Sequence, residues 1–213
     1  IVGKVGTDLH TTTFDPDVAR DLTARVRPYG SYIKGHYTDG VSNPEQYPLC
    51  GMGAANVGPE FTMSEYDALA ELEVKEQEMD REGRVAQLSH ITDVLKRLVC
   101  DSNRWRKWLH GDEAGREFDA LTPERQMWLV KTGCRYIWQS PEALVARQTL
   151  YGNLRRAGYD PEEVVLGRIE RDMDKYFHAF NLINLKFKKR NLFGSLSLVF
   201  IGFLKFFFQP TVL

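Results

Sequence analysis

The chain has 213 residues, of which 43% are hydrophobic and 27% are charged, as in an ordinary soluble globular protein. Its formal net charge is −1, so no overall basic field favours nucleic acid, and we expect no nucleic-acid partner. Three widely spaced cysteines, Cys50, Cys100 and Cys134, match neither a disulfide framework nor a zinc site. These features exclude a small disulfide-rich secreted domain and favour a reducing, cytoplasmic location.

Three short strands and one helix are expected in the N-terminal part. Residues 1–10, 31–39 and 49–58 predict the strands, and residues 15–30 predict a helix between the first two. Asp15 is the expected N-cap of that helix. This strand–helix–strand order is typical of a parallel α/β arrangement. The chain also begins without a methionine, and we expect it to be a fragment or a processed product.

The middle of the chain is expected to be almost wholly helical. A capping box formed by Thr62 and Glu65 predicts a helix start. Further on, apolar residues at three- or four-residue spacing predict an amphipathic helix from about Val85 to about Cys100; they are Val85, Leu88, Ile91, Leu95 and Leu98. Three later helix starts are each marked by a cap residue followed by proline: Thr122-Pro123, Ser140-Pro141 and Asp160-Pro161.

The C-terminal tail has a different composition. A basic cluster precedes residues 192–208, a run of 17 residues that is interrupted only by Lys205. Its length and flanking charge are compatible with a membrane anchor. The alternative is an extension that is not native structure, because the run lacks helix caps, periodicity and acidic residues. Both interpretations of residues 183–213 stay open at this point.

Polar groups follow the three predicted strands. The ligand sites of parallel α/β folds lie at the carboxyl ends of the strands, so we expect these groups to meet at one rim. They are Asp8, His10, Thr11, Thr12, Thr13, Lys34, His36, Thr38, Asp39, Asn56 and the backbone of Gly58.

The two histidines at this rim are candidates for chemistry. His10 and His36 are candidate metal ligands, with Asp8 or Asp39 as partners. One of them is also a candidate acid/base for an enolisable substrate. The alternative is that each histidine only forms a hydrogen bond to a neighbouring strand or turn.

Residues 51–58 are rich in glycine and precede a helix start. Glycines let a backbone approach an anion, so this stretch is a candidate phosphate cradle. No Gly-Lys-Ser/Thr sequence follows, and the nearby Glu60 and Glu65 oppose a strong anion site. Close packing of a glycine-rich strand explains the same residues, and both explanations stay open.

Several motifs resemble one family. Residues 34–39, "KGHYTD", resemble a His-x-Thr-Asp strand end, and residues 56–62, "NVGPEFT", resemble a Val-Gly-Pro-x-x-Thr strand end. Both belong to the non-catalytic subunit family of class II D-tagatose-bisphosphate aldolases, earlier regarded as tagatose-6-phosphate kinases. Residues 134–138, "CRYIW", and 166–180, "LGRIERDMDKYFHAF", are similar to the C-terminal helices of that family.

The resemblance implies a fold and a division of the chain. Members are TIM barrels, so the expected fold class is α/β: the C-terminal part of a TIM (β/α)8 barrel followed by a helical region. Residues 1–82 would be the last βα units, 83–182 the helical region, and 183–213 a basic-hydrophobic tail. The first five or so βα units would be missing, which makes the chain a fragment that we expect to be inactive by itself.

The resemblance also implies a function. We expect a protein of carbohydrate metabolism that is either the accessory subunit of a class II tagatose-bisphosphate aldolase or a related ketose epimerase. Its partners would be a sugar or sugar phosphate and a catalytic aldolase subunit. An epimerase would use a divalent metal ion, zinc or manganese, to polarise the carbonyl. The alternative from another class is a non-enzymatic, partner-binding helical subunit, tethered to a membrane by its tail.

The expected site residues follow from the same resemblance. Catalytic roles would belong to His36, Asp39 and Lys34, substrate binding to Asn56, Gly58 and Thr38, and metal binding to His10 and His36. The chain departs from the family pattern at two places. It has Lys34-Gly35 where the family has Glu-Ala, and Asn56 where a lysine is expected. These departures alter the expected metal binding and anion recognition.

Overall fold

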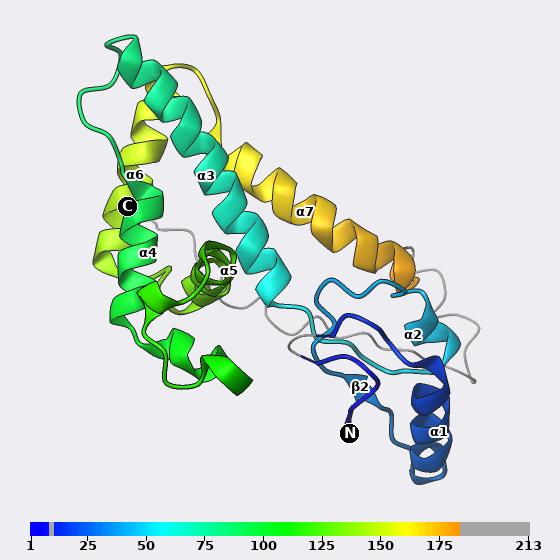
Figure 1. Ribbon diagram of the computed structural model, residues 1–213. Coiled ribbons are helices and arrows are strands. Elements are labelled where there is room, and N and C mark those ends of the chain that lie inside the picture. Colours follow the sequence, from blue (N-terminus) through cyan, green and yellow to red (C-terminus); the bar gives the residue numbers. More distant parts are fainter. Residues whose placement is uncertain (9–10, 184–213) are drawn as a thin grey trace. The chain divides into compact units, whose positions relative to one another are not determined.

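The computed structural model describes residues 1–8 and 11–183, and Figure 1 shows their helices and strands. The chain forms two compact units. The first unit contains Ile1–Glu60 and the segment that begins at Asp172, and the second unit is Phe61–Arg171. Each unit is described below by itself.

The first unit contains a small parallel sheet. Strand β1, Val2–Gly3, pairs with strand β2, Lys34–Gly35, in the register Val2 to Lys34. A single parallel bridge joins Lys34 to Ala54 on the other side of β2. The three predicted strand segments are therefore neighbours, with the segment around β2 in the middle.

The predicted fold class, the C-terminal part of a TIM (β/α)8 barrel, is wrong for this chain. Within residues 1–8 and 11–183, the structure contains one two-stranded sheet, and most of the remaining regular structure is helical. Each strand pairs over only two residues, and closing a barrel requires many more strands. The predicted division of the chain into residues 1–82, 83–182 and 183–213 stays a prediction.

Helix α1, Pro16–Val26, begins as the sequence predicts. The Asp15 side chain accepts hydrogen bonds from the backbone N–H groups of Asp17, at 3.0 Å, and Val18, at 3.1 Å. The predicted N-cap is therefore confirmed. A short 3-10 helix, η1, Arg27–Tyr29, follows and ends at Gly30, whose φ of 66° lies in the left-handed region.

Replacing Asp15 by alanine is expected to lower the free energy of unfolding by about 1 kcal/mol, because two N–H groups at the start of α1 lose their acceptor. Asp17→Ala is the matched control, since Asp17 is exposed and only pairs with Arg20 at the surface. We expect the control to cost less than about 0.5 kcal/mol. Urea unfolding of both variants tests this, and equal losses would contradict the capping role.

The core of the first unit is built around Tyr47, in helix α2, Gln46–Leu49. The Tyr47 ring stacks on Phe14, with centroids 4.1 Å apart, and lies 5.4 Å from the ring of Phe180. Gly35 of β2 faces the same ring, where an added Cβ would lie 2.6 Å from a Tyr47 ring carbon. Phe180 follows helix α7, Pro161–Ala179, so the end of that helix completes the core of this unit.

The second unit is helical. Helix α4, Ile91–Asp101, packs against both α5, Pro123–Gly133, and α6, Pro141–Arg156. Helices α5, α6 and α7 begin at Pro123, Pro141 and Pro161, so the predicted starts are confirmed. The Ser140 side chain does not cap α6, because its hydroxyl donates to the Ile137 carbonyl instead. The predicted helix before Cys100 is shorter than the apolar spacing indicated, because α4 begins only at Ile91.

Helix α3, Pro59–Arg81, does not begin at the predicted capping box. It starts three residues before Thr62, and both Thr62 and Glu65 are buried within it. The Glu65 carboxylate lies 2.6 Å from the Arg147 guanidinium instead of turning back to cap the helix. The capping-box interpretation is therefore wrong.

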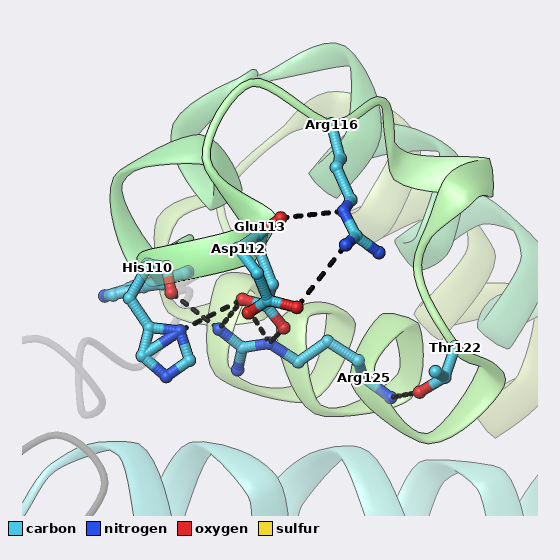
Figure 2. A network of polar contacts seen from close by, with 7 residues as sticks. His110, Asp112, Glu113, Arg116, Thr122 and Arg125 are labelled. Atoms are coloured by element: carbon cyan, nitrogen blue, oxygen red, sulfur yellow. Dashed lines mark hydrogen bonds and ion pairs between the residues drawn. The ribbon is translucent and has the colours of Figure 1, made fainter.

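The segment between α4 and α5 forms three 3-10 helices: η2, Arg104–Trp108; η3, Gly111–Glu113; and η4, Phe118–Ala120. Figure 2 shows how this segment is attached to α5. Arg125 binds the Glu113 carboxylate through two nitrogens, at 2.8 and 2.9 Å, and donates to the Trp108 carbonyl at 2.6 Å. Such two-point pairing fixes both groups in one geometry.

No helix in the described part of the chain is long and apolar enough to span a bilayer. The apolar run 192–208, to which the membrane interpretation refers, lies outside the described residues.

Candidate functional site

The predicted rim lies in the first unit, where the segment after β2 meets the segment after Ala54. The Lys34 ammonium donates to the Asn56 side-chain oxygen at 3.5 Å. The backbone N–H of Thr38 donates to the Asn56 carbonyl at 3.0 Å, so the two segments stay in contact beyond the bridge. The structure therefore brings Lys34, Thr38 and Asn56 together.

His36 has an unsatisfied group at this rim. Its Nδ1 atom is buried and forms no hydrogen bond with the described residues. The His36 backbone is fixed by a hydrogen bond, because the Thr7 hydroxyl donates to the His36 carbonyl at 2.7 Å. The next residue, Tyr37, has a φ of 54°, which is uncommon for a residue other than glycine. Its ring packs edge-on against the imidazole, with centroids 4.3 Å apart.

Asp39 caps helix α3 from a distant part of the sequence. One carboxylate oxygen accepts hydrogen bonds from the backbone N–H groups of Gly58, at 2.8 Å, and Glu60, at 2.9 Å. Burial raises the pKa of the Asp39 carboxyl above its ordinary value, whereas the two N–H donors favour the ionised form. This contact explains why α3 begins at Pro59, and local sequence motifs carry no signal for it.

Replacing Asp39 by alanine is expected to cost about 1–2 kcal/mol of unfolding free energy, because the start of α3 loses its acceptor. Asp39→Asn is the matched control, since its amide oxygen can accept the same hydrogen bonds, and it should cost less than half as much. Thermal unfolding measures both. Equal costs would indicate that the carboxylate charge, rather than the cap geometry, stabilises the helix start.

Two predicted substrate-binding residues use their polar groups within the fold. The Thr38 side chain is buried, and its hydroxyl oxygen accepts from the Tyr47 hydroxyl and from the Asn56 N–H, each at 3.4 Å. The Gly58 N–H donates to Asp39. These bonds give both residues a structural role, and their predicted contact with substrate stays a prediction.

Tyr176 of α7 and Glu60 of α3 belong to the same rim, although the sequence pattern did not single them out. The buried Tyr176 hydroxyl accepts from the Gly40 N–H at 3.0 Å and lies 3.1 Å from the Thr38 carbonyl. It also forms a hydrogen bond with the Glu60 carboxylate, which accepts from the Gly40 N–H at 2.8 Å. Burial raises the pKa of Tyr176, so the hydroxyl stays protonated. The loop at Thr38–Gly40 is thus held by two helices.

The predicted metal ligands are only partly placed. Within residues 1–8 and 11–183, no three His, Cys, Asp or Glu side chains lie together as a metal site requires. His10 lies outside the described residues. A metal bound by His10 and His36 therefore stays a prediction.

The glycine-rich segment before α3 is used for packing. Gly51 has a φ of 70° just after α2. Gly53 lies against Tyr32, where an added Cβ would overlap the Tyr32 side chain. These contacts, together with the Gly58 bond to Asp39, favour close packing over a phosphate cradle.

Comparison with known protein families identifies one that matches this chain. The family described as "D-tagatose-1,6-bisphosphate aldolase subunit GatZ/KbaZ-like" matches residues 5–166. The match covers more than half of the chain and includes Lys34, His36, Asp39 and Asn56, whereas Tyr176 lies beyond it. No curated protein matches the chain.

Proposed function

Because the chain belongs to the D-tagatose-1,6-bisphosphate aldolase subunit GatZ/KbaZ-like family, we propose that it is an accessory subunit that supports a separate class II aldolase. The family resemblance predicted from the strand-end motifs is confirmed, and so is a place in carbohydrate metabolism as an aldolase subunit. The accessory role and the cytoplasmic location predicted from the sequence belong to this proposal.

The family match is the observation on which the proposal depends. The rim geometry supports it in a second way. Asp39 caps α3, the buried Thr38 hydroxyl accepts from the Tyr47 hydroxyl, and the Gly58 N–H is bonded to Asp39. Because these polar groups already form hydrogen bonds within the fold, the geometry favours a supporting role for the chain over an independent active site.

Association with a catalytic subunit tests the proposal. The full chain and a class II tagatose-bisphosphate aldolase subunit would be mixed and passed through size-exclusion chromatography with light scattering. We expect a joint species whose aldolase activity outlasts that of the catalytic subunit alone at elevated temperature. His36→Ala should leave both results unchanged. Separate elution together with an unchanged activity half-life would contradict the accessory role.

A second candidate function is favoured by one observation: the buried Nδ1 of His36 has no hydrogen-bond partner among the described residues, two positions after Lys34, which contacts Asn56. In this version the chain is a ketose or ketose-phosphate epimerase. His10 and His36 would hold a divalent ion, zinc or manganese, which when bound would polarise the substrate carbonyl. Lys34 and Asn56 would contact the sugar, and Asp39 would complete the predicted catalytic set.

Metal content and epimerisation distinguish this candidate from the first. Elemental analysis of the purified chain should show close to one zinc or manganese ion, and His36→Ala should remove it. Proton NMR of ketoses and ketose phosphates should show epimerisation by the chain without any partner. Epimerisation that persists in His36→Ala would show that this histidine is not catalytic.

A further inference from the structure

A group of cations surrounds one exposed aromatic ring in the second unit. Tyr136 ends the short 3-10 helix η5, Cys134–Tyr136, and its side chain is exposed. The Lys107 ammonium lies 4.1 Å from its ring centroid, the Arg104 guanidinium 5.0 Å and the Arg135 guanidinium 5.3 Å. We call Arg104, Lys107, Arg135 and Tyr136 the basic-aromatic patch.

Two cations of the patch are not neutralised by a neighbouring acid: in the described part of the chain, no carboxylate lies within ion-pair distance of Arg104 or Lys107. Four carboxylates of this region instead pair with other cations: Asp101 with Arg97 at 3.5 Å, Asp112 with Arg116 at 3.4 Å, Glu113 with Arg125 at 2.8 Å and Glu117 with Arg106 at 2.6 Å. Figure 2 shows two of these pairs, Arg116 with Asp112 and Arg125 with Glu113.

The patch is also held in place. The Lys107 ammonium donates to the Tyr136 hydroxyl at 2.6 Å, which joins η2 to η5. Both 3-10 helices pack against α5. Behind the exposed ring lies the buried indole of Trp108, with centroids 5.7 Å apart. A partner would therefore meet cations that are already gathered, and it would lose less free energy to ordering them.

We propose that the basic-aromatic patch is a docking surface for an acidic segment of a partner protein. Several cations around one ring repel one another, and carboxylates placed among them relieve that repulsion. Arginine and tyrosine are enriched at the energetic centres of protein interfaces. Arg104, Lys107 and Tyr136 are exposed, so successive Asp and Glu side chains of one segment can engage them together. The inference goes beyond the proposed function and stands whether or not the chain supports an aldolase.

Direct binding of a model peptide tests the proposal. A decaglutamate peptide would be titrated into the full chain by calorimetry at about 20 mM and about 500 mM NaCl, since screening weakens such contacts. The test variant is Arg104→Glu with Lys107→Glu. The matched control is Arg81→Glu with Arg84→Glu, two exposed arginines in the same unit with the same change in charge. We expect roughly tenfold weaker binding for the test variant and at most about twofold weaker binding for the control.

Several outcomes would overturn the proposal. Equal weakening by both double variants would show that only overall charge matters. Competition by inorganic phosphate or D-tagatose 1,6-bisphosphate at concentrations similar to those of the peptide would indicate a small-anion site. Tighter binding of a thymidine oligonucleotide than of the peptide would indicate a nucleic-acid surface.

A variant that leaves every charge in place gives an independent check. Tyr136→Leu removes the ring that gathers the cations, and we expect it to weaken peptide binding about threefold. Circular dichroism and thermal unfolding would first establish that each variant is folded. Unchanged peptide affinity in a folded Tyr136→Leu protein would contradict the role assigned to the ring.

Discussion

Replacing Arg147 by alanine is expected to lower the free energy of unfolding by roughly 3–5 kcal/mol at neutral pH. Arg147 of α6 lies 2.6 Å from the Glu65 carboxylate of α3, and the Glu65 side chain is only 4% exposed. The second Glu65 oxygen has no hydrogen-bond partner in the described residues. The guanidinium also stacks over the buried Trp138 ring, 5.0 Å from its centroid. Without Arg147, a buried carboxylate would lose its counter-charge.

Urea unfolding and a double-mutant cycle measure this effect. The double variant Glu65→Gln with Arg147→Met removes both charges and keeps much of the buried volume, so we expect it to lose less than half as much stability as Arg147→Ala. If the double variant loses as much as the single one, lost packing rather than an uncompensated charge explains the result.

The same ion pair predicts a pH dependence. Burial raises the pKa of Glu65 above its ordinary value of 4.5, and Arg147 opposes that shift. A carboxyl with a raised folded pKa favours the folded state fully below its unfolded pKa and loses that contribution as the pH rises through the folded pKa. Arg147→Ala removes the opposing influence, so its cost should be larger at neutral pH than near pH 4. Glu65→Gln should abolish this difference, and a cost independent of pH would contradict a buried ionised Glu65.

Replacing Glu76 by alanine should be the second large effect, at roughly 3 kcal/mol or more. Glu76 lies in α3 and is fully buried. Its carboxylate accepts hydrogen bonds from the Ser89 N–H at 3.1 Å, from the Ser89 hydroxyl at 2.5 Å and from the Asn153 amide of α6. Alanine would leave these buried donors without their acceptor, and the loop before α4 would lose its attachment to α3.

Two further variants serve as controls for the Glu76→Ala prediction. Glu76→Gln retains an acceptor and the shape of the side chain, so it should cost about half as much as alanine. Glu78→Ala, two residues along the same helix, removes an exposed carboxylate that pairs with Lys75 and should leave the free energy of unfolding nearly unchanged. Thermal unfolding of the three variants gives the order of their stabilities. A Glu76→Ala protein as stable as Glu78→Ala would refute the buried network.

The parts of the fold that follow from the sequence are those set by local chemistry. The Asp15 cap and the prolines at positions 123, 141 and 161 are signals that lie within one helical turn, and the helices begin where they indicate. The start of α3 depends on Asp39, which lies 19 residues before Gly58 and 21 before Glu60. No local pattern encodes that contact. Glu65 therefore looked like part of a capping box, although in the folded chain it pairs with an arginine 82 residues away.

The barrel expectation failed for a related reason. Motifs at strand ends identify a family, but closure of a sheet depends on pairing among many strands, which short motifs do not specify. At the rim, the sequence indicated Lys34 and Asn56, and the structure places them in contact. The sequence did not indicate that Tyr176 belongs to the rim, since a tyrosine in an amphipathic helix is ordinarily a packing residue. Only the folded chain brings its hydroxyl to Thr38, 138 residues earlier.

Cleavage of D-tagatose 1,6-bisphosphate tests the central claim most directly. The assay would contain the chain alone, a class II catalytic subunit alone, and both together. We predict no turnover by the chain alone and faster or longer-lived turnover by the mixture than by the catalytic subunit alone, with His36→Ala behaving like the native chain. Turnover by the chain alone that His36→Ala abolishes, or a mixture no better than the catalytic subunit by itself, would contradict the accessory role.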